Sequence, residues 1–288
     1  MPRKISYKIT DEYNGRKVLD FLKHCGYSHR LITKLKQAPD GILLNGSHVR
    51  TVDFMKEGDT LEINLPADEK ESISIPVKMP LDIVYEDDDL IVVNKPAMLA
   101  VHESHNHLGD TLSNAIAYYL KEKGVQAVFR AVGRLDKGTS GLMVCALNKY
   151  TASKLSGKIQ KQYLAIASAV FEGNGTIDAP IYRPDPIITV RTVDERGERA
   201  VTHWEALKND GENTLLKIRL ETGRTHQIRV HFAHIGAPLV GDTMYGKADE
   251  RICHQALHCC YCSFIHPVTN EKIEFYRDMP EDMKGILE

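Results

Sequence analysis

Residues 133–144 read GRLDKGTSGLMV, a charged turn that runs directly into an apolar segment. In this turn the carboxylate of Asp136 stands between Arg134 and Lys137, and a stretch rich in glycine and hydroxyl residues follows. Flanking positive charge favours the ionised carboxylate, which is the form that a nucleophile or a base requires. A surface aspartate in the loop before a strand is the alternative, and these residues alone favour it. The apolar residues predict a strand over 142–146.

A second polar segment, TGRTHQIRVHFAH at 222–234, follows a predicted strand over 214–220. Gly223 and the polar residues after it open a helix whose first N–H groups, together with Arg224 and Arg229, can face an anion. Arg229 can also pair with a carboxylate through two hydrogen bonds. The three histidines of the segment invite a metal interpretation, but their spacing is not that of the helical metal-binding motifs.

A third segment, KQYLA at 161–165, leads into another predicted strand over 163–170. Tyr163 stands at the mouth of that strand, where it can stack on a nucleobase or relay a proton. Taken alone, the segment instead favours a half-buried aromatic residue of a strand.

The larger part of the chain mixes strands and helices. A further strand is predicted over 201–207, and helices are predicted over about 110–123 and 151–160. Asp110 is the expected N-cap of the first helix, and Gly124 is its expected stop. Because the order shows no regular strand–helix–strand alternation, it favours an α+β domain over a doubly wound sheet.

The first 66 residues form a small unit of their own. Two short amphipathic helices are predicted within 16–37, with Ser28 as the N-cap of the second. Asn45-Gly46 lies between short apolar runs and predicts a hairpin, because both turn residues must accept positive φ. An alternating strand over 60–65 completes the unit.

Charge divides the chain in a similar way. Residues 1–66 carry a net charge of +3, residues 67–90 a net charge of −6 and residues 91–288 a net charge of +1. The acidic run Asp87-Asp88-Asp89 is interpreted as a hairpin turn rather than a metal site. Two prolines and mixed charge over 67–80 predict a linker. The expected organisation is a module at 1–66, a linker at 67–80 and a main domain at 81–288.

The composition excludes several classes of protein. Hydrophobic residues make up 42% of the 288 residues and charged residues 26%, which is typical of a globular chain rather than of one disordered throughout. No apolar run approaches the ~18 residues that a membrane helix needs. The N-terminus shows neither a signal core nor a transit pattern, so we expect a cytoplasmic protein. A net charge of −2 argues against a general nucleic-acid coat protein but allows a local basic surface.

The six cysteines do not suggest a disulfide framework in a cytoplasmic chain of this size. The segment Cys253–His266 holds many potential metal ligands, but no second cluster stands at zinc-finger spacing. Residues 256–265 fit an apolar strand in which cysteine acts as a small hydrophobic residue, and we expect no metal there.

Together these segments resemble the RluA-type family of RNA pseudouridine synthases. GRLDKGTSGLMV is similar to that family's motif HRLDRDTSGL, KQYLA to its Lys-x-Tyr strand, and TGRTHQIRVHFAHIGAPLVGDTMYG to its third conserved block. LIVVNKPAMLAVH and the tail LHCCYCSFIHP also resemble family segments, and the resemblance covers about 82–278. The unit at 16–65 is similar to the α-L RNA-binding module first seen in a small-subunit ribosomal protein.

The resemblance implies an α+β fold, in which a mixed, mostly antiparallel sheet carries a central cleft and a small α/β RNA-binding module precedes it. It implies isomerisation of specific uridines in RNA to pseudouridine, without a metal or an organic cofactor. Asp136 would be the essential carboxylate, Arg229 would pair with it, and Tyr163 would lie against the target base. Arg134 would help to fill the stack when the uridine leaves it. The other residues expected to contact the substrate are Lys137, Thr139, Ser140, Arg224, His226 and Gln227.

The chain departs from the family motif at Gly133, where His is usual, at Lys137, where Arg is usual, and at Gly138, where Asp is usual. Because the Asp-x-x-Thr-Ser-Gly core is kept, we expect activity. The two glycines are the support for an alternative, a catalytically silent RNA-binding or ribosome-assembly factor. A carboxylate-based hydrolase of nucleosides or sugars is disfavoured, because the sequence offers no second well-placed carboxylate.

Two chemical routes stay open for the carboxylate: attack on the anomeric carbon of the ribose, or removal of its 2′ proton. The basic residues of the module are expected to contact phosphates, and they are Lys17, Arg30, Lys34 and Lys36. By analogy with the family, the module favours large-subunit ribosomal RNA over transfer RNA as the partner. A monomer is the default expectation.

Overall fold

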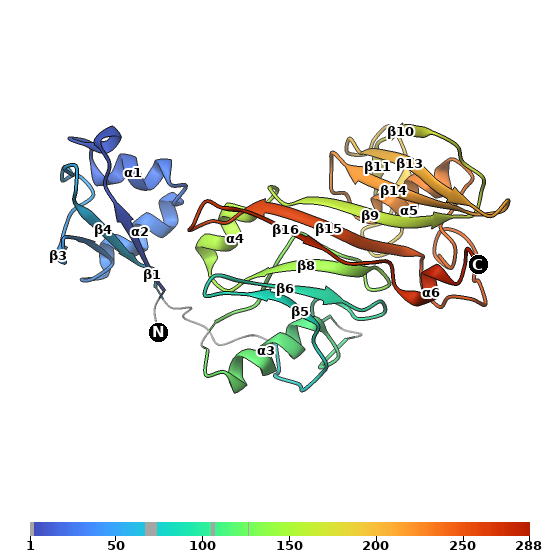
Figure 1. Ribbon diagram of the computed structural model, residues 1–288, viewed down its shortest axis with the longest axis horizontal. Coiled ribbons are helices and arrows are strands. Elements are labelled where there is room, and N and C mark those ends of the chain that lie inside the picture. The colour runs from blue at the N-terminus through green and yellow to red at the C-terminus, as the bar shows by residue number, and fades with distance from the viewer. Residues whose placement is uncertain (1–2, 67–73, 105–106, 126) are drawn as a thin grey trace.

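The computed structural model describes residues 3–66, 74–104, 107–125 and 127–288. Figure 1 shows a small N-terminal unit beside a larger body that is built on one long sheet. The predicted linker falls partly on residues 67–73, which lie outside the described residues. Among the residues that are described, no helix has the length and apolar character needed to cross a membrane.

The N-terminal module, residues 3–66, packs two helices on a four-stranded sheet. The helices are α1 (Val18–His24) and α2 (His29–Gln37), and a single 3-10 turn, η1 (Asp11–Tyr13), precedes them. The strands lie in the order β1 (Lys4–Lys8), β4 (Thr60–Asn64), β2 (Ile42–Leu44) and β3 (Ser47–His48).

Local signals in the sequence account for much of this module. Ser28 Oγ accepts from Leu31 N at 3.3 Å, so Ser28 is the N-cap of α2 as predicted. Asn45 and Gly46 have φ values of 51° and 79°, which confirms the predicted tight hairpin. Strand β1 was not predicted from the sequence, and it pairs with β4 along its whole length.

The body contains a ten-stranded sheet in which the only parallel pairing among the described strands joins β8 to β15. A mixed, mostly antiparallel sheet is therefore confirmed. From one edge to the other its strands are β10 (Asn174–Asp178), β13 (Val201–Asn209), β14 (Thr214–Leu220), β9 (Gln160–Ala167), β15 (Leu257–Ile265), β8 (Ser140–Ala146), β6 (Leu90–Lys95) and β5 (Ile83–Glu86), with β16 (Lys272–Tyr276) paired to β15 and β7 (Arg130–Val132) paired to β8. A separate small ladder pairs β11 (Ile181–Tyr182) with β12 (Thr192–Val193).

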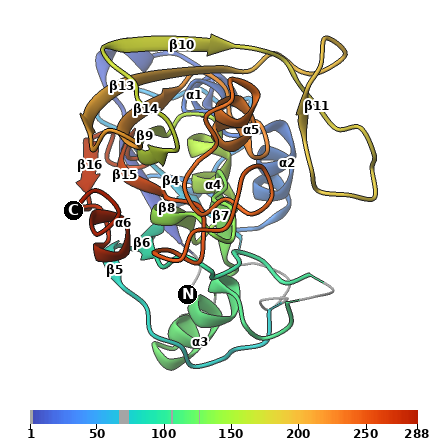
Figure 2. The same ribbon diagram turned by 90° about the vertical axis from the view of Figure 1, so that its right-hand side faces the viewer.

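All seven residues of β8 are buried, so this strand forms the centre of the core. The helices of the body are α3 (Leu112–Glu122), α4 (Lys149–Leu155), α5 (Gln227–His234) and α6 (Glu281–Lys284). In Figure 2, α3 lies away from α5, and the segment around β11 projects from the body. The acidic run at 87–89 forms the turn between β5 and β6, as predicted.

Two helix boundaries differ from the prediction. The N-cap of α3 is Thr111 rather than Asp110, because Thr111 and Asn114 form a reciprocal capping box. Asp110 instead accepts a hydrogen bond from His107. Helix α4 covers 149–155 rather than 151–160, because the chain turns at Gly157 (φ 71°) and β9 has begun by residue 160.

Candidate active site

A cleft of about 900 Å³ opens across the middle of the body. Its walls come from the loop before β8, the start of β9, the end of β14 and the first turns of α5. The three polar segments singled out in the sequence therefore meet around one cavity. It lies where the loops leave the buried centre of the sheet, so these side chains are held by a rigid core.

Asp136 faces this cleft with its side chain 14% exposed. The nearest cation is Arg229, whose Nη1 donates to Asp136 Oδ2 at 3.3 Å. His226 Nε2 lies 3.9 Å from the same oxygen, and Arg134 Nη2 lies 3.9 Å from Oδ1. The carboxylate thus lies beside Arg229 and His226, which are about 90 residues away in the sequence, and beside its near neighbour Arg134, and it lines the cleft.

Arg229 is held mainly by a second carboxylate that the sequence analysis did not single out. Its Nε and Nη2 donate to the two oxygens of Asp242 at 2.7 and 2.8 Å, which is a bidentate pair. Asp242 is 1% exposed and also accepts from the backbone N–H groups of Met244 and Tyr245. Burial is the largest single effect on the pKa of Arg229 and lowers it, but the hydrogen bonds to Asp242 and the charges of Asp242 and Asp136 together raise the pKa above its ordinary value. Asp242 therefore fixes the guanidinium that faces Asp136.

His226 takes a left-handed backbone conformation (φ 56°) at the N-cap of α5, which is uncommon for a residue with a side chain. Its Nδ1 lies 2.8 Å from the hydroxyl of Tyr245, and that hydroxyl accepts from Arg191 N at 2.9 Å. The contact with Tyr245 therefore orients the imidazole, so that its Nε2 faces Asp136. Burial is the main cause that lowers the pKa of His226, while Asp136 acts in the opposite direction.

Tyr163 lies on β9, lines the cleft and is 7% exposed. Burial raises the pKa of its hydroxyl well above the usual value. The phenol stays protonated, so it can stack or donate a hydrogen bond but is a poor acceptor for a proton.

Lys95 is a residue of the site region that sequence reasoning missed. It is 1% exposed, and its Nζ donates to the carbonyls of Pro96, Leu99 and Lys137 at 2.8, 2.9 and 3.1 Å. Burial lowers the pKa of Lys95 to about 7, although Asp136 acts to raise it. Because the Lys137 carbonyl follows Asp136 directly, Lys95 holds the loop that carries the carboxylate. A charged residue at the end of the apolar run LIVVNK is the signal that marks it.

Arg134 and Arg224, expected to contact substrate, lie at the rim of the cleft. Arg134 is 58% exposed and donates to Thr225 Oγ1 at 2.8 Å. Arg224 forms an ion pair with Glu198 and donates to the Arg199 carbonyl at 3.1 Å. Both cations are thus already held by partners of the protein.

The remaining residues expected to bind substrate have internal partners or face elsewhere. Ser140 Oγ lies 2.8 Å from His258 Nδ1 inside the sheet, and Thr139 Oγ1 accepts from Gln255 at 3.0 Å. Gln227 Oε1 accepts from Arg224 N, and Gln227 Nε2 donates to the Val201 carbonyl. Lys137 is exposed and lies outside the set of residues that line the cleft. Thr139 and Gln227 nevertheless line the cleft, whereas Ser140 is not among its lining residues.

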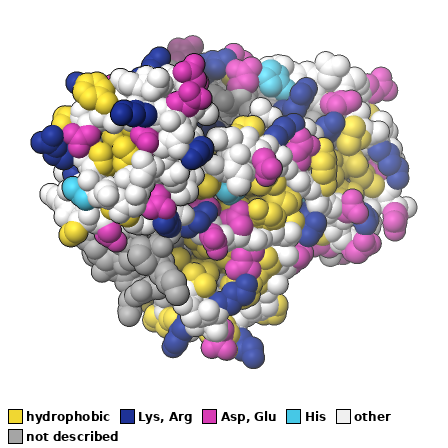
Figure 3. Space-filling view, turned by 60° about the vertical axis from the view of Figure 1, so that its left-hand side comes forward, with side chains coloured by type: hydrophobic (Ala, Val, Ile, Leu, Met, Phe, Trp, Pro, Cys, Tyr) yellow, Lys and Arg dark blue, Asp and Glu magenta, His cyan; other side chains and the backbone are white. Residues whose placement is uncertain are grey.

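The four basic residues predicted for the module lie outside the cleft. Lys17, Arg30 and Lys36 are exposed. Lys34 is half-buried and lines a groove between the module and the body. In Figure 3, basic and acidic side chains are interspersed over the visible face rather than gathered by sign.

The segments that invited a metal interpretation have other roles in the structure. Cys259 and Cys262 are buried in the core on β15, and both ring nitrogens of His231 have protein partners, Thr202 and Ala179. Within the described residues, the one cluster with metal-ligand geometry comprises Asp87, Asp89 and His266. Its Asp89 carboxylate is already bound by Arg3 and Asn148.

The sequence of this chain is similar to those of known proteins. A family model described as RNA pseudouridylate synthase matches residues 89–234. An uncharacterized RNA pseudouridine synthase, YjbO of Bacillus subtilis (strain 168), is 38% identical over 94% of this chain and 98% of that protein. Ribosomal large subunit pseudouridine synthase D of Haemophilus influenzae is 41% identical over 73% of this chain and 70% of that protein.

The fold also has relatives among solved structures. The structure of human RNA Pseudouridylate Synthase Domain Containing 1 is similar with a TM-score of 0.57 and 27% identity. The match covers 69% of this chain and 83% of that one.

Proposed function

This chain belongs to the RNA pseudouridylate synthase family and is an RNA pseudouridine synthase, which is an isomerase. From that premise we propose that Asp136 is the essential carboxylate of the enzyme. We also propose that the enzyme acts on specific uridines of large-subunit ribosomal RNA. The observation that carries the proposal is the position of Asp136, half-buried in the cleft and paired with Arg229 at 3.3 Å. A second group of relatives, named ribosomal large subunit pseudouridine synthase D, supports the choice of RNA.

The reaction exchanges one bond for another within a single nucleotide. The bond from ribose C1′ to uracil N1 breaks, the uracil turns, and C1′ bonds to C5. The C5 proton is lost, and N1 ends with a proton, so the atoms of the product equal those of the substrate. A uridine within folded RNA must first leave its stack, which costs a few kcal/mol. Arg134, exposed at the rim, is placed to occupy the gap.

Two routes are compatible with a carboxylate at this position. Asp136 can attack C1′, as the nucleophile of a retaining glycosidase does, or it can remove the 2′ proton to leave an unsaturated sugar. In either route the detached uracil carries negative charge, and donors held in a water-poor pocket stabilise it. Arg229 is such a donor, and His226 Nε2 faces the same carboxylate. RNA deuterated at C2′ separates the routes, because only proton removal gives a primary isotope effect.

Tyr163 is assigned to the target base. Its ring lines the same cleft as Asp136, and the raised pKa of its hydroxyl favours stacking or hydrogen-bond donation over proton removal. Of the other residues that the resemblance suggests for substrate, Arg134, Arg224 and His226 are kept in the proposal.

The test is tritium release from RNA labelled at C5 of uridine. We expect Asp136→Asn to lower release by at least about 1,000-fold while RNA binding changes little, because the carboxylate acts in the reaction itself. Asp249→Asn, which removes a surface carboxylate paired with Arg251, is the matched control and should release tritium as the wild type does. Release that persists in Asp136→Asn would remove Asp136 from its assigned role.

The choice of RNA has a separate test. Pseudouridine mapping of total RNA from cells with and without the gene should show loss at one or a few positions of large-subunit ribosomal RNA. Loss confined to transfer RNA would overturn the ribosomal assignment without affecting the proposed role of Asp136.

A further inference from the structure

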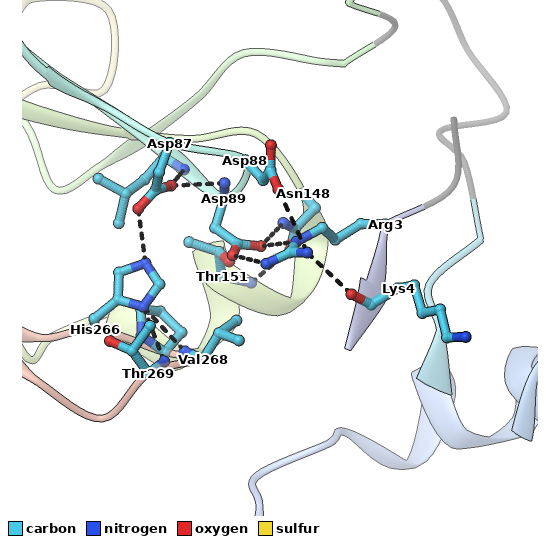
Figure 4. Close-up of polar contacts among 12 residues, drawn as sticks. Arg3, Lys4, Asp87, Asp88, Asp89, Asn148, Thr151, His266, Val268 and Thr269 are labelled. Carbon is cyan, nitrogen blue, oxygen red and sulfur yellow. Dashed lines mark hydrogen bonds and ion pairs between the residues drawn. The ribbon is translucent and has the colours of Figure 1, made fainter. Parts of the chain in front are cut away.

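The N-terminal module is joined to the body by a partly buried ion pair as well as by the chain. Arg3, just before β1, donates from Nε to Asp89 Oδ1 at 3.1 Å and from Nη2 to Oδ2 at 2.8 Å. Asp89 is 1% exposed and also accepts from Asn148 Nδ2 at 2.9 Å. Figure 4 shows this carboxylate between Arg3 of the module and Asn148, the N-cap of α4. A bidentate pair defines an orientation as well as a distance.

A cluster of three tyrosines forms a second contact. The rings of Tyr27 in the module and Tyr150 on α4 stack with their centroids 4.5 Å apart. The Tyr7 hydroxyl lies 2.9 Å from that of Tyr27 and 3.4 Å from that of Tyr150. Tyr150 is 2% exposed and packs within the hydrophobic core of the module. A residue of the body thus completes the core of the module.

Helix α4 links this contact to the cleft. Lys154 Nζ donates to the Cys25 carbonyl at 2.8 Å. The approach is close, because a Cβ on Gly26 would lie 2.9 Å from Lys154 Cδ. Leu155, the last residue of α4, lines the cleft, and so does Lys158 in the turn after the helix. A helix of seven residues is about 10 Å long. One short, rigid element therefore carries both the residues that contact the module and part of the cleft wall.

We propose that this junction, formed by Arg3 with Asp89, Tyr7 and Tyr27 with Tyr150, and Cys25 with Lys154, determines which RNAs the enzyme accepts by fixing the module relative to the cleft. A module joined only by the chain samples many separations and accepts RNAs of many shapes. A module that is fixed to the body accepts only an RNA with one geometry. In that RNA, the target uridine and the segment bound by the module lie at one defined distance and angle from each other. This inference rests on the proposed function and on the expectation, from the resemblance of residues 16–65, that the module binds the same RNA as the cleft.

The experiment uses the full chain with Arg3→Gln and Tyr150→Ala combined, which removes the ion pair and the ring stack. The conservative variant Tyr150→Phe, which keeps both the Arg3–Asp89 pair and the ring stack, should retain the wild-type behaviour. Arg251→Gln, which breaks an exposed ion pair far from the junction in the sequence, is the matched control. The substrates are the full ribosomal RNA transcript with its mapped uridine and a short hairpin cut around the same uridine.

We expect the double variant to raise KM for the long transcript by about tenfold or more, because the two binding sites no longer act at one fixed geometry. The kcat for both RNAs and the KM for the hairpin should stay within about twofold of wild type, since Asp136 and its partners are untouched. Small-angle scattering should show a more extended molecule.

Equal effects on the hairpin and the transcript would overturn the proposal, because a general loss of structure acts on both. It is also overturned if scattering shows an extended variant whose KM for the transcript is unchanged, or a variant that is still compact. Filter binding of the same two RNAs requires no turnover. It therefore tests the junction even if the wild type forms no pseudouridine, an outcome that would count against the proposed function alone.

Discussion

At the scale of single residues, Arg229 contacts two carboxylates whose environments differ. Asp242 binds it bidentately and is fully enclosed, whereas Asp136 meets its remaining nitrogen at 3.3 Å and faces the cavity. Asp242 therefore holds the guanidinium in place, and the guanidinium presents a fixed positive charge to Asp136. Removing one member of a buried pair leaves an uncompensated charge, which is far more damaging than losing an exposed pair.

We predict that Asp242→Asn lowers the free energy of unfolding by about 3 kcal/mol and lowers kcat more than it changes KM. Urea denaturation with an unchanged m-value and steady-state tritium release are the measurements. Asp249→Asn, in an exposed pair, should cost less than about 1 kcal/mol. If the two variants were equally stable, Asp242 would not be the residue that positions Arg229.

Lys95 gives a pH-dependent prediction. Its pKa is about 7 in the folded protein, below the ordinary value of 10.5, so the unfolded chain binds more protons between these two values. The contribution of Lys95 to stability is therefore fullest above the unfolded value and is lost as the pH falls toward 7. Comparing wild type with Lys95→Met, we expect the stability advantage of wild type to grow between pH 7 and 9, by at most about 1.4 kcal/mol per unit.

Denaturant unfolding of both proteins at several pH values measures this difference. A difference that is constant with pH would show that Lys95 titrates alike in the folded and unfolded chains. Lys95→Met removes the donor that three backbone carbonyls share, so that variant should be less stable than wild type at pH 9, where the wild-type amine is neutral.

At the scale of elements, the loop before β8 explains one departure from the family motif. A Cβ on Gly138 would lie 2.3 Å from Gln255 Oε1, and Gln255 is 6% exposed and bonded to Thr139. Gln255 thus fills the space that a side chain at position 138 would need. The other departure, Gly133, has a positive φ of 79°, which most side chains adopt only with strain.

We predict that Gly138→Ala destabilises the protein by about 1–3 kcal/mol and that the cost falls when Gln255→Ala is present. A double-mutant cycle by urea unfolding should give a coupling energy above about 0.5 kcal/mol. Strict additivity would mean that Gln255 is not what excludes a side chain from position 138.

At the scale of the whole molecule, charge is distributed by segment. The near-zero total of −2 combines a module of net charge +3 with a strongly acidic stretch at 67–90. Part of that acidity binds the module itself, since Arg3 pairs with Asp89 and lies 3.5 Å from Asp88. We expect the exposed cations of the module, which lie outside this ion pair, to contact the phosphate backbone of RNA.

Lys17→Gln, Arg30→Gln and Lys36→Gln together should weaken RNA binding and flatten its dependence on salt. Neutralising a cation that binds one phosphate reduces the steepness of log K against log salt by about 0.7–0.9. Lys34 is left unchanged because it lines the groove beside the body. Lys284→Gln, on the C-terminal helix α6, is the control. An unchanged slope would show that these three residues do not bind phosphate.

Short-range features of this protein could be predicted from the sequence because neighbouring residues cause them. The Asn45-Gly46 turn, the Ser28 cap and the apolar run of β8 each depend on a few consecutive residues. The grouping of Asp136, Tyr163 and Arg229 was expected because whole motifs resemble a family, and the structure brings these residues to one cleft.

Other features depended on the tertiary structure, because they join residues whose separation in the chain carries no local signal. The three carbonyls around Lys95, the Asp242 carboxylate behind Arg229 and the Arg3–Asp89 pair depend on how distant segments pack. A buried charge cannot remain without a partner, so each of these groups has one. The sequence by itself determined the local elements and the chemistry of the motifs, and only the packing of the sheet and the module decided which charge faces which.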